Sequence, residues 1–271
     1  RVVACFFMPG QIDRAASIVG KVFALSQEEA ELHLEEVLRR FAARHRNVAK
    51  VFESHYERVK EAVKGRLSYP RHVSKEKQLL IGSYFTMEYS IESSAFYNPS
   101  IVEDPYQGLL QAGQLRVIMS FRATGEGHLS SIVFRGGVLT EENELLLDPP
   151  GSLVDLAETV RRHTYEKRDF IEKLAEMRVH KDVVAEIMDR LGERFSYGEL
   201  RASVAETREK RQLSYSRSKV IEAIDWLADS HYEVGFSRDT ALSERVIFPV
   251  SSSESNGLED ARFVRFQDNG S

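Results

Sequence analysis

The spacing between apolar residues changes three times along this chain, and each change predicts a switch between helix and strand. In residues 12–66 the apolar residues recur every three or four positions, which is the spacing of one helix face. Between residues 79 and 135 they alternate with polar neighbours, as in a half-buried strand. Helical spacing returns over residues 152–230, and alternation resumes after residue 232. The sequence therefore predicts an α+β fold in the order helical, β, helical, β.

Polar residues at the expected helix ends predict where the helices begin. Ser26 and Glu29 have the spacing of a capping box, in which each side chain binds the backbone N–H of the other residue. A serine followed three residues later by a carboxylate also predicts helix starts at Ser152 and Ser196. The first helical segment carries one long apolar stripe that stops at Gly65. Such a stripe must be covered, so we expect an oligomer interface or a lid.

Alternating patterns predict three strands before the second helical segment and two after it. The first three lie near residues 79–91, 115–122 and 128–135, and the glycine-containing loop between the last two predicts a hairpin. The later two are residues 245–250 and 261–266. We expect these strands to form one antiparallel sheet structure, with the second helical segment inserted between them.

Charge and cysteine content exclude several classes of protein. The 271 residues include 37 Lys and Arg against 42 Asp and Glu, so the formal net charge is −5 and we expect no nucleic-acid partner. No apolar run reaches the roughly 18–20 residues of a membrane helix, so we expect no membrane contact. Cys5 is the only cysteine, which excludes an internal disulfide and a multi-cysteine zinc site. It fits a reducing compartment, and we expect a cytoplasmic protein.

Two further patterns favour a structural interpretation. Residues 193–201 are similar to the turn of a helix-turn-helix, but residues 152–230 hold 15 Lys or Arg against 16 Asp or Glu, whereas a DNA-reading module is normally basic. His33, His45 and His55 lie twelve and ten residues apart, which is not the spacing of a compact metal-binding face. We therefore expect no metal site.

A polar hairpin loop is the first candidate site. Residues 122–128 place Arg122, Glu126 and His128 within one short loop, and its glycines leave room for a ligand. A sugar or phosphate site needs such convergent donors and acceptors. A tight turn closed by an Arg–Glu ion pair would use the same residues, so both interpretations stay open.

Two more polar clusters lie on β segments. Glu259 and Asp260 stand next to Arg262, so one acid could hold a proton while the other is oriented by the arginine. The alternative is a strand-entry turn with a structural salt bridge. Asn98 precedes Pro99, which keeps it out of the helical conformation. Its amide then either points at a ligand or caps a turn.

Three segments taken together resemble glycoside hydrolase family 130, which contains β-mannoside phosphorylases and β-mannosidases. They are FYNPSIV at residues 96–102, VIMSFRATGEGHLSSIVFR at 117–135, and SERVIFPVSSSESNGLEDARFVRF at 243–266. The chain is most similar to the longer, glycosidase-related members, which carry helical segments at the N-terminus and between early strands. The resemblance covers essentially the whole chain.

The resemblance implies a five-bladed β-propeller with its active site at one end of the central channel. Since each blade has about four strands, a complete propeller needs roughly twenty, and this sequence shows six to eight. We therefore expect the N-terminal part of a longer protein, or partner chains that cover an exposed sheet edge. The expected parts are an N-terminal helical segment (1–70), the first propeller strands (71–151), a helical insertion (152–230) and a truncated continuation of the propeller (231–271).

The resemblance also assigns site residues. The Asn of the family's Asn-Pro motif and the Arg that ends an early strand fall on Asn98 and Arg122, which would bind sugar. The proton donor, the Asp of a Glu-Asp-Pro-Arg motif, falls on Asp260, with Glu259 and Arg262 as substrate-binding neighbours. Alanine replaces the proline of that motif here, which loosens the turn that positions Asp260.

The longer members share a Gly-Glu-Gly-His signature, which falls on Glu126 and His128. These two side chains either contact the ligand or brace Arg122 from below.

The implied activity is cleavage of β-mannosides with inversion. One protonated carboxylic acid acts at the leaving oxygen, and a nucleophile arrives on the opposite face of the sugar. With phosphate as the nucleophile the product is mannose 1-phosphate, which is the activity we favour; with water the protein is a hydrolase. We expect an oligosaccharide substrate, no cofactor apart from inorganic phosphate as a co-substrate, and a homo-oligomer formed through the helical segments.

The groups that bind phosphate or activate water would lie beyond Ser271, so we expect this chain alone to be inactive. Fold does not guarantee activity. The rival hypothesis is a non-catalytic sugar-binding or interaction protein on a propeller scaffold. A helical regulatory module with the β part as its sensor is a third, weaker alternative.

Overall fold

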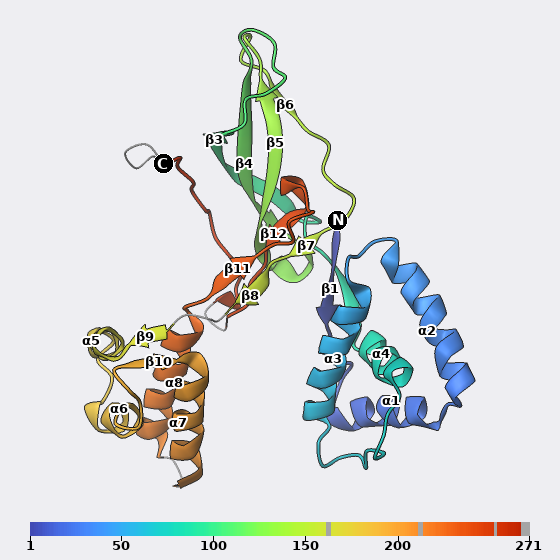
Figure 1. Ribbon diagram of the computed structural model, residues 1–271, viewed down its shortest axis with the longest axis vertical. Helices are drawn as coiled ribbons and strands as arrows, with labels where there is room; N and C mark the ends of the chain where they lie inside the picture. The colour runs from blue at the N-terminus through green and yellow to red at the C-terminus, as the bar shows by residue number, and fades with distance from the viewer. Residues whose placement is uncertain (161–163, 211–213, 252–253, 267–271) are drawn as a thin grey trace. The chain divides into compact units, whose positions relative to one another are not determined.

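The computed structural model describes residues 1–160, 164–210, 214–251 and 254–266 (Figure 1). Within these ranges the chain forms two compact units. The first comprises Arg1–Leu156, Arg238–Val246 and the described residues from Glu259 onward, and the second comprises Ala157–Ser237 and Ile247–Leu258. Helices and strands are mixed, so the α+β prediction is confirmed at that level.

The N-terminal part of the first unit consists of helices and a short antiparallel ribbon. The helices are α1 (Ile12–Ala24), α2 (Gln27–Ala42), α3 (Val48–Ala62) and α4 (Lys75–Tyr84), and the ribbon pairs β1 (Val2–Phe6) with β2 (Thr86–Ser90). Ser26 Oγ accepts the N–H of Glu29 at 3.1 Å, and Glu29 Oε2 accepts the N–H of Ser26 at 2.7 Å, so the capping box is confirmed. The single stripe expected from Ala30 to Val63 is wrong in detail, because it is divided between α2 and α3, and the chain turns between them at Asn47, which has φ 52°.

The strand expected over residues 79–91 is wrong in its first half. The chain is helical up to Tyr84, and this helix begins where Ser74 Oγ accepts the N–H of Lys77 at 3.4 Å. α4 lies among α1, α2 and α3 and contacts all three (Figure 1). Its residues 79–81 are buried. A helix covered on several sides lacks a polar face, so its sequence does not show one-sided helical spacing. The strand pattern holds only from Thr86.

The helices α3 and α4 approach each other closely at Gly82. A Cβ atom placed on Gly82 would lie 1.8 Å from the carbonyl oxygen of Phe52. Phe52 is fully buried on α3, so its backbone has no room to retreat. Glycine is therefore required at this position by the packing of two backbones.

The β part of the first unit is a sheet with the strand order β3-β4-β5-β12-β7, and β6 pairs with β5 beside that path. The strands are β3 (Ala95–Glu103), β4 (Leu115–Thr124), β5 (Ser130–Leu139), β6 (Leu145–Leu147), β7 (Asp155–Leu156) and β12 (Arg245–Ile247). β4 and β5 pair antiparallel from Leu115↔Leu139 to Thr124↔Ser130, so the predicted hairpin is confirmed. β12 and β7 are parallel, so the sheet is not antiparallel throughout. The sheet is open within the described residues, and the propeller stays a prediction.

The two strands predicted near the end of the chain are shorter or absent. The one expected over 245–250 ends at Ile247, and residues 261–266 form no ladder with a described strand. Side chains nevertheless hold this last segment along β3. The N–H of Phe263 donates to Ser100 Oγ at 3.0 Å. The segment is attached to the sheet edge without extending the sheet.

A nearly buried cluster of three charged side chains links the residue before β1, the turn that follows β2, and β5. Glu92 Oε1 accepts hydrogen bonds from Arg1 Nη2 at 2.5 Å and from Arg135 Nη2 at 2.7 Å. The three side chains are only 8–16 % exposed. Burial alone would raise the pKa of Glu92, but the two guanidinium groups outweigh it and hold that pKa below its usual range. Glu92 is therefore an ionised carboxylate whose charge is offset by the two guanidinium groups.

The second unit is a helical bundle with short ribbons. Its helices are α5 (Lys167–Glu176), α6 (Lys181–Met188), α7 (Tyr197–Lys210) and α8 (Tyr215–Asp229), and its ribbons pair β8 (Glu158–Val160) with β11 (Glu233–Gly235) and β9 (Thr164–Glu166) with β10 (Arg194–Ser196). The helices share one apolar core, which includes Leu174, Ile187 and Ile224. The helix start expected at Ser152 is wrong, because the strands β7 and β8 follow it at residues 155–156 and 158–160. The start at Ser196 is confirmed, since its Oγ accepts the N–H of Glu199 at 3.3 Å.

Candidate functional site

The candidate site lies in the first unit, where β3, β4 and the segment from Glu259 onward meet. Asn98 is on β3 at an irregularity, because the pairing register with β4 shifts between Tyr97 and Ser100. Pro99 has no N–H to give to a ladder, which explains the interruption. Asn98 has φ 50°, in the left-handed region that asparagine tolerates better than most residues. The bulge turns the Asn98 side chain out of the regular strand alternation.

The side chains of Asn98 and Arg122 converge on one carboxylate. Asn98 Nδ2 donates to Asp260 Oδ1 at 2.7 Å, and Arg122 Nη1 donates to the same oxygen at 3.4 Å. Arg122 Nη2 donates to Glu259 Oε1 at 3.4 Å. The two adjacent carboxylates thus share one guanidinium group. Asp260 itself has φ 22°, so the backbone turns sharply where it delivers this pair.

The polar side chains around Arg122 hold it in place. Its Nε donates to Ser130 Oγ at 3.1 Å, and its guanidinium carbon lies 5.4 Å from the centre of the Tyr97 ring. Thr124 Oγ1 lies 3.1 Å from Ser130 Oγ and 3.2 Å from the Tyr97 hydroxyl. The Arg122 side chain is 18 % exposed. The cation is therefore oriented by the sheet, while its two outer nitrogens remain directed at the acids.

Arg262 holds the other side of the bulge. Its Nη1 donates to the carbonyl oxygen of Asn98 at 3.2 Å. Next to it, Phe263 packs edge-on against Phe134 of β5 with the ring centres 5.8 Å apart. These contacts fix the segment that carries Glu259 and Asp260 against the sheet.

The electrostatics of the cluster favour the charged form of Asp260. The hydrogen bond from the Asn98 amide, followed by the bond and charge of Arg122, holds the pKa of Asp260 below its ordinary value. Its side chain is 44 % exposed, so water also stabilises the carboxylate. In this arrangement Asp260 accepts hydrogen bonds and is not a proton donor at neutral pH.

Glu126 and His128 lie outside this network. They occupy a short 3₁₀ turn between β4 and β5, with φ near 65° at Gly127 and His128, and their side chains are exposed. The hydroxyl of Tyr89 donates to the backbone carbonyl of Glu126, so the turn is held through its main chain. The polar brace expected for Arg122 comes from Ser130.

The structure therefore brings together five residues singled out in the sequence: Asn98, Arg122, Glu259, Asp260 and Arg262. Sequence reasoning missed Tyr97, Ser100 and Ser130. Strand alternation could have indicated two of them, Tyr97 and Ser130. Ser130 pairs with Thr124, two residues from Arg122, and Tyr97 pairs with Arg122 directly, so all lie on one face of the sheet.

In the part of the chain that the structure describes, no group of three or more His, Cys, Asp or Glu side chains lies close enough to hold a metal ion, and no helix is long and apolar enough to cross a membrane. Comparison with known protein families, characterised sequences and solved structures found no match for this chain. Any assignment of function therefore depends on the residues and contacts described above.

Proposed function

We propose that this chain is the N-terminal part of a glycoside-cleaving enzyme of the family 130 type, whose open sheet begins a five-bladed β-propeller. One observation carries the proposal. Asn98, Arg122 and Asp260, which match the family's motifs at three separate places in the sequence, lie in a single hydrogen-bonded cluster. Side chains 138 and 162 positions apart have no local reason to meet. Binding of the same ligand would require these side chains to lie together.

In the proposed reaction Asn98 and Arg122 bind hydroxyl groups of a β-mannoside, and Asp260 protonates the leaving oxygen. A phosphate ion attacks the opposite face and yields mannose 1-phosphate with inversion. Asp260 needs a proton for this role. A sugar that takes over the donors of Asn98 and Arg122 removes the groups that lower its pKa, and burial beneath the sugar raises it. Substrate binding thereby converts the carboxylate into an acid.

Two other functions use the same cluster. With water in place of phosphate, the protein is an inverting β-mannosidase. A non-catalytic sugar-binding protein is favoured by one specific observation, the exposed and charged state of Asp260. A carboxylate beside an amide and a guanidinium group accepts hydrogen bonds from sugar hydroxyls without any proton transfer.

The test is an assay of the complete polypeptide that carries this chain. It is incubated with β-mannosyl disaccharides, with and without phosphate, and mannose 1-phosphate and mannose are measured. Sugar phosphate formed only in the presence of phosphate supports the phosphorylase. Free mannose formed without phosphate supports the hydrolase. Binding of these sugars without any product supports the non-catalytic protein.

The variant Asp260→Asn separates catalysis from binding. It keeps an acceptor oxygen but cannot deliver a proton, so turnover should fall by about 10²–10⁴-fold. Sugar affinity should stay within a few-fold. Asp13→Asn, which removes an exposed carboxylate on α1, is the matched control and should leave both quantities unchanged. Equal turnover in Asp260→Asn and the native protein contradicts the assignment of Asp260 as the acid.

A further inference from the structure

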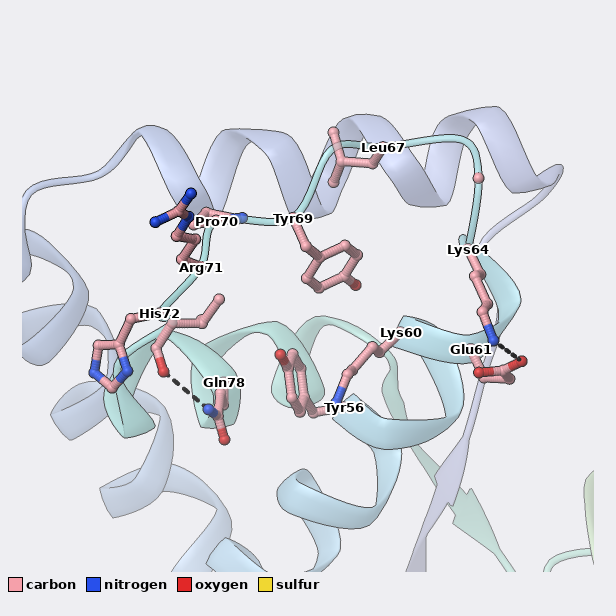
Figure 2. A pocket seen from close by; sticks show the side chains of 12 residues that line it. Tyr56, Lys60, Glu61, Lys64, Leu67, Tyr69, Pro70, Arg71, His72 and Gln78 are labelled. Carbon is pink, nitrogen blue, oxygen red and sulfur yellow. Dashed lines mark hydrogen bonds and ion pairs between the residues drawn. The ribbon is translucent and has the colours of Figure 1, made fainter.

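A pocket of about 540 Å³ lies between the C-terminal end of α3 and the loop that leads to α4 (Figure 2). Its lining comes from α3, from most of the loop residues between Lys64 and Val73, and from Gln78 of α4. None of these residues belongs to the cluster around Asp260. The volume falls within the ~300–1,000 Å³ of typical small-molecule sites.

The lining of this pocket carries an excess of positive charge. Lys60, Lys64 and Arg71 line it, and Glu61 is the single acid among the lining residues. Lys64 pairs with Glu61 at 3.3 Å and Lys60 with Glu57 at 3.0 Å, but all four side chains are about half to three-quarters exposed. Exposed pairs of this kind are weak, so both lysines remain available to a ligand.

Arg71 lies toward the other end of the pocket, beside His72 (Figure 2). It forms no ion pair with any residue in the described ranges. The carbonyl end of α3 disfavours a bound anion, and the cations placed around it offset that effect.

The hydroxyl group of Tyr69 distinguishes this pocket from an ordinary basic surface. Its oxygen is buried and has no hydrogen-bond partner within the part of the chain that the structure describes. Figure 2 shows the Tyr69 ring hanging from the loop toward α3, where Tyr56 and Lys60 face it. Burial raises the pKa of Tyr69 to about 12, so the hydroxyl keeps its proton at neutral pH. A buried donor without an acceptor is destabilising, and a bound anion would supply the acceptor.

We propose that this pocket binds a phosphorylated small molecule. The phosphate group lies between Lys60 and Lys64, where the Tyr69 hydroxyl reaches it once the side chain turns out of its buried position. The organic part lies along Leu67 and Pro70. A phosphate monoester fits because its three terminal oxygens can accept from several donors at once and its charge approaches −2 at neutral pH. The apolar side chains of the loop give the organic part a surface that inorganic phosphate would leave uncovered.

Isothermal titration calorimetry on the 271-residue chain tests the binding, with phenyl phosphate, inorganic phosphate and phenol as probes in a phosphate-free buffer of low salt. Phenyl phosphate should bind, inorganic phosphate should bind several-fold more weakly, and phenol should not bind. Lys60→Ala should weaken phenyl phosphate binding by about tenfold or more, because a charge-assisted hydrogen bond is lost. Lys181→Ala, an equal loss of charge on α6, is the control. No binding of either phosphate, or an equal loss in the control, overturns the proposal.

Tyr69→Phe gives a second readout that does not depend on the affinity of the probe. Removing an unpaired buried hydroxyl should raise the Tm of the ligand-free protein, while the affinity for phenyl phosphate should fall. A higher Tm together with a lower affinity is expected only if the hydroxyl has no partner in the ligand-free protein and gains one from the ligand. A lower Tm in the ligand-free variant means that the hydroxyl already has a partner, and it overturns the proposal.

Discussion

Asn98 and Asp260 stand 162 positions apart in the sequence, and the amide of Asn98 donates to the Asp260 carboxylate at 2.7 Å. The contact exists because a proline-induced bulge turns Asn98 out of β3 and a sharp backbone turn presents Asp260. It is also the largest cause of the lowered pKa of Asp260. The enzymatic and the sugar-binding hypotheses both depend on this pair.

Asn98→Gly should raise the pKa of Asp260 toward its ordinary value. Glycine accepts the positive φ of position 98, so the backbone is preserved and only the amide is lost. The pKa should stay somewhat low, because Arg122 still faces the carboxylate. A pH titration of the Asp260 carboxyl carbon by NMR measures the change. Asn143→Gly removes another asparagine with positive φ and should leave this pKa unchanged; an unaltered titration in Asn98→Gly would show that the amide does not act on Asp260.

Gly82→Ala should destabilise the first unit by about 3 kcal/mol or more, because the added methyl group meets the backbone of Phe52. Gly20→Ala on α1 is a matched substitution within a helix. There the nearest atom to the new methyl group is Leu67 Cδ1 at 3.8 Å, which is an ordinary contact. It should stabilise by about 0.5–1 kcal/mol through helix propensity. Urea unfolding followed by circular dichroism measures both, and equal effects of the two substitutions would contradict the close approach of α3 and α4.

Glu92→Gln should destabilise the first unit by about 3 kcal/mol, because it leaves two nearly buried guanidinium groups without their carboxylate. Glu36→Gln, in an exposed pair with Arg40, should cost less than about 0.5 kcal/mol. Hydrogen exchange read by mass spectrometry localises the effect to β1 and β5. Since the folded pKa of Glu92 is lowered, its contribution is present above the unfolded pKa and is lost as the pH falls through the folded value.

His55 should make the first unit less stable in mild acid. The residue is buried on α3, with Nδ1 2.7 Å from Thr86 Oγ1, and burial followed by the charge of Arg58 lowers its pKa to about 4. In the unfolded chain the pKa is about 6.5. Between these two pKa values the unfolded chain binds a proton at His55 that the folded chain does not bind. The contribution of neutral, buried His55 to the free energy of unfolding is therefore complete above about pH 6.5 and is lost as the pH falls to 4.

The expected size of that loss is about 2–3 kcal/mol. His55→Phe should flatten the pH dependence of the unfolding free energy between pH 6.5 and 4, measured by urea unfolding. His33→Phe, at an exposed position on α2, should keep the slope of the native protein. A native slope in His55→Phe would assign the acid sensitivity to another group.

The parts of the fold that were predictable from sequence are those fixed by neighbours in the chain. The capping box of Ser26 needs only Glu29, and the β4–β5 hairpin is specified by alternation on both sides of a glycine-containing loop. α4 was not predictable in this way, because its burial on several sides erases the helical spacing. Residues 261–266 alternate like a strand, but a strand also needs a ladder partner, which the pattern does not supply.

The same distinction applies to the candidate site. The resemblance to a known family named Arg122 and Asp260, but no local rule placed them within hydrogen-bond distance. That proximity follows from the path of the chain between β4 and Glu259. The hydrogen bond between Arg122 and Ser130 could be recognised only from the pairing register of β4 and β5, which places both side chains on the same face of the sheet. Glu126 and His128 share the same loop, yet the turn leaves their side chains in solvent.

The pairing of Arg122 with Glu259 and Asp260 has a consequence for any molecule that seeks this guanidinium group. Because both acids are tethered to the same polypeptide, they compete as an internal ligand at a high effective concentration. An external sugar or anion must displace them, so its apparent affinity is reduced by the fraction of molecules in which the internal pair is closed. Arg122 therefore binds an external ligand only when the ligand concentration is high enough to displace Glu259 and Asp260.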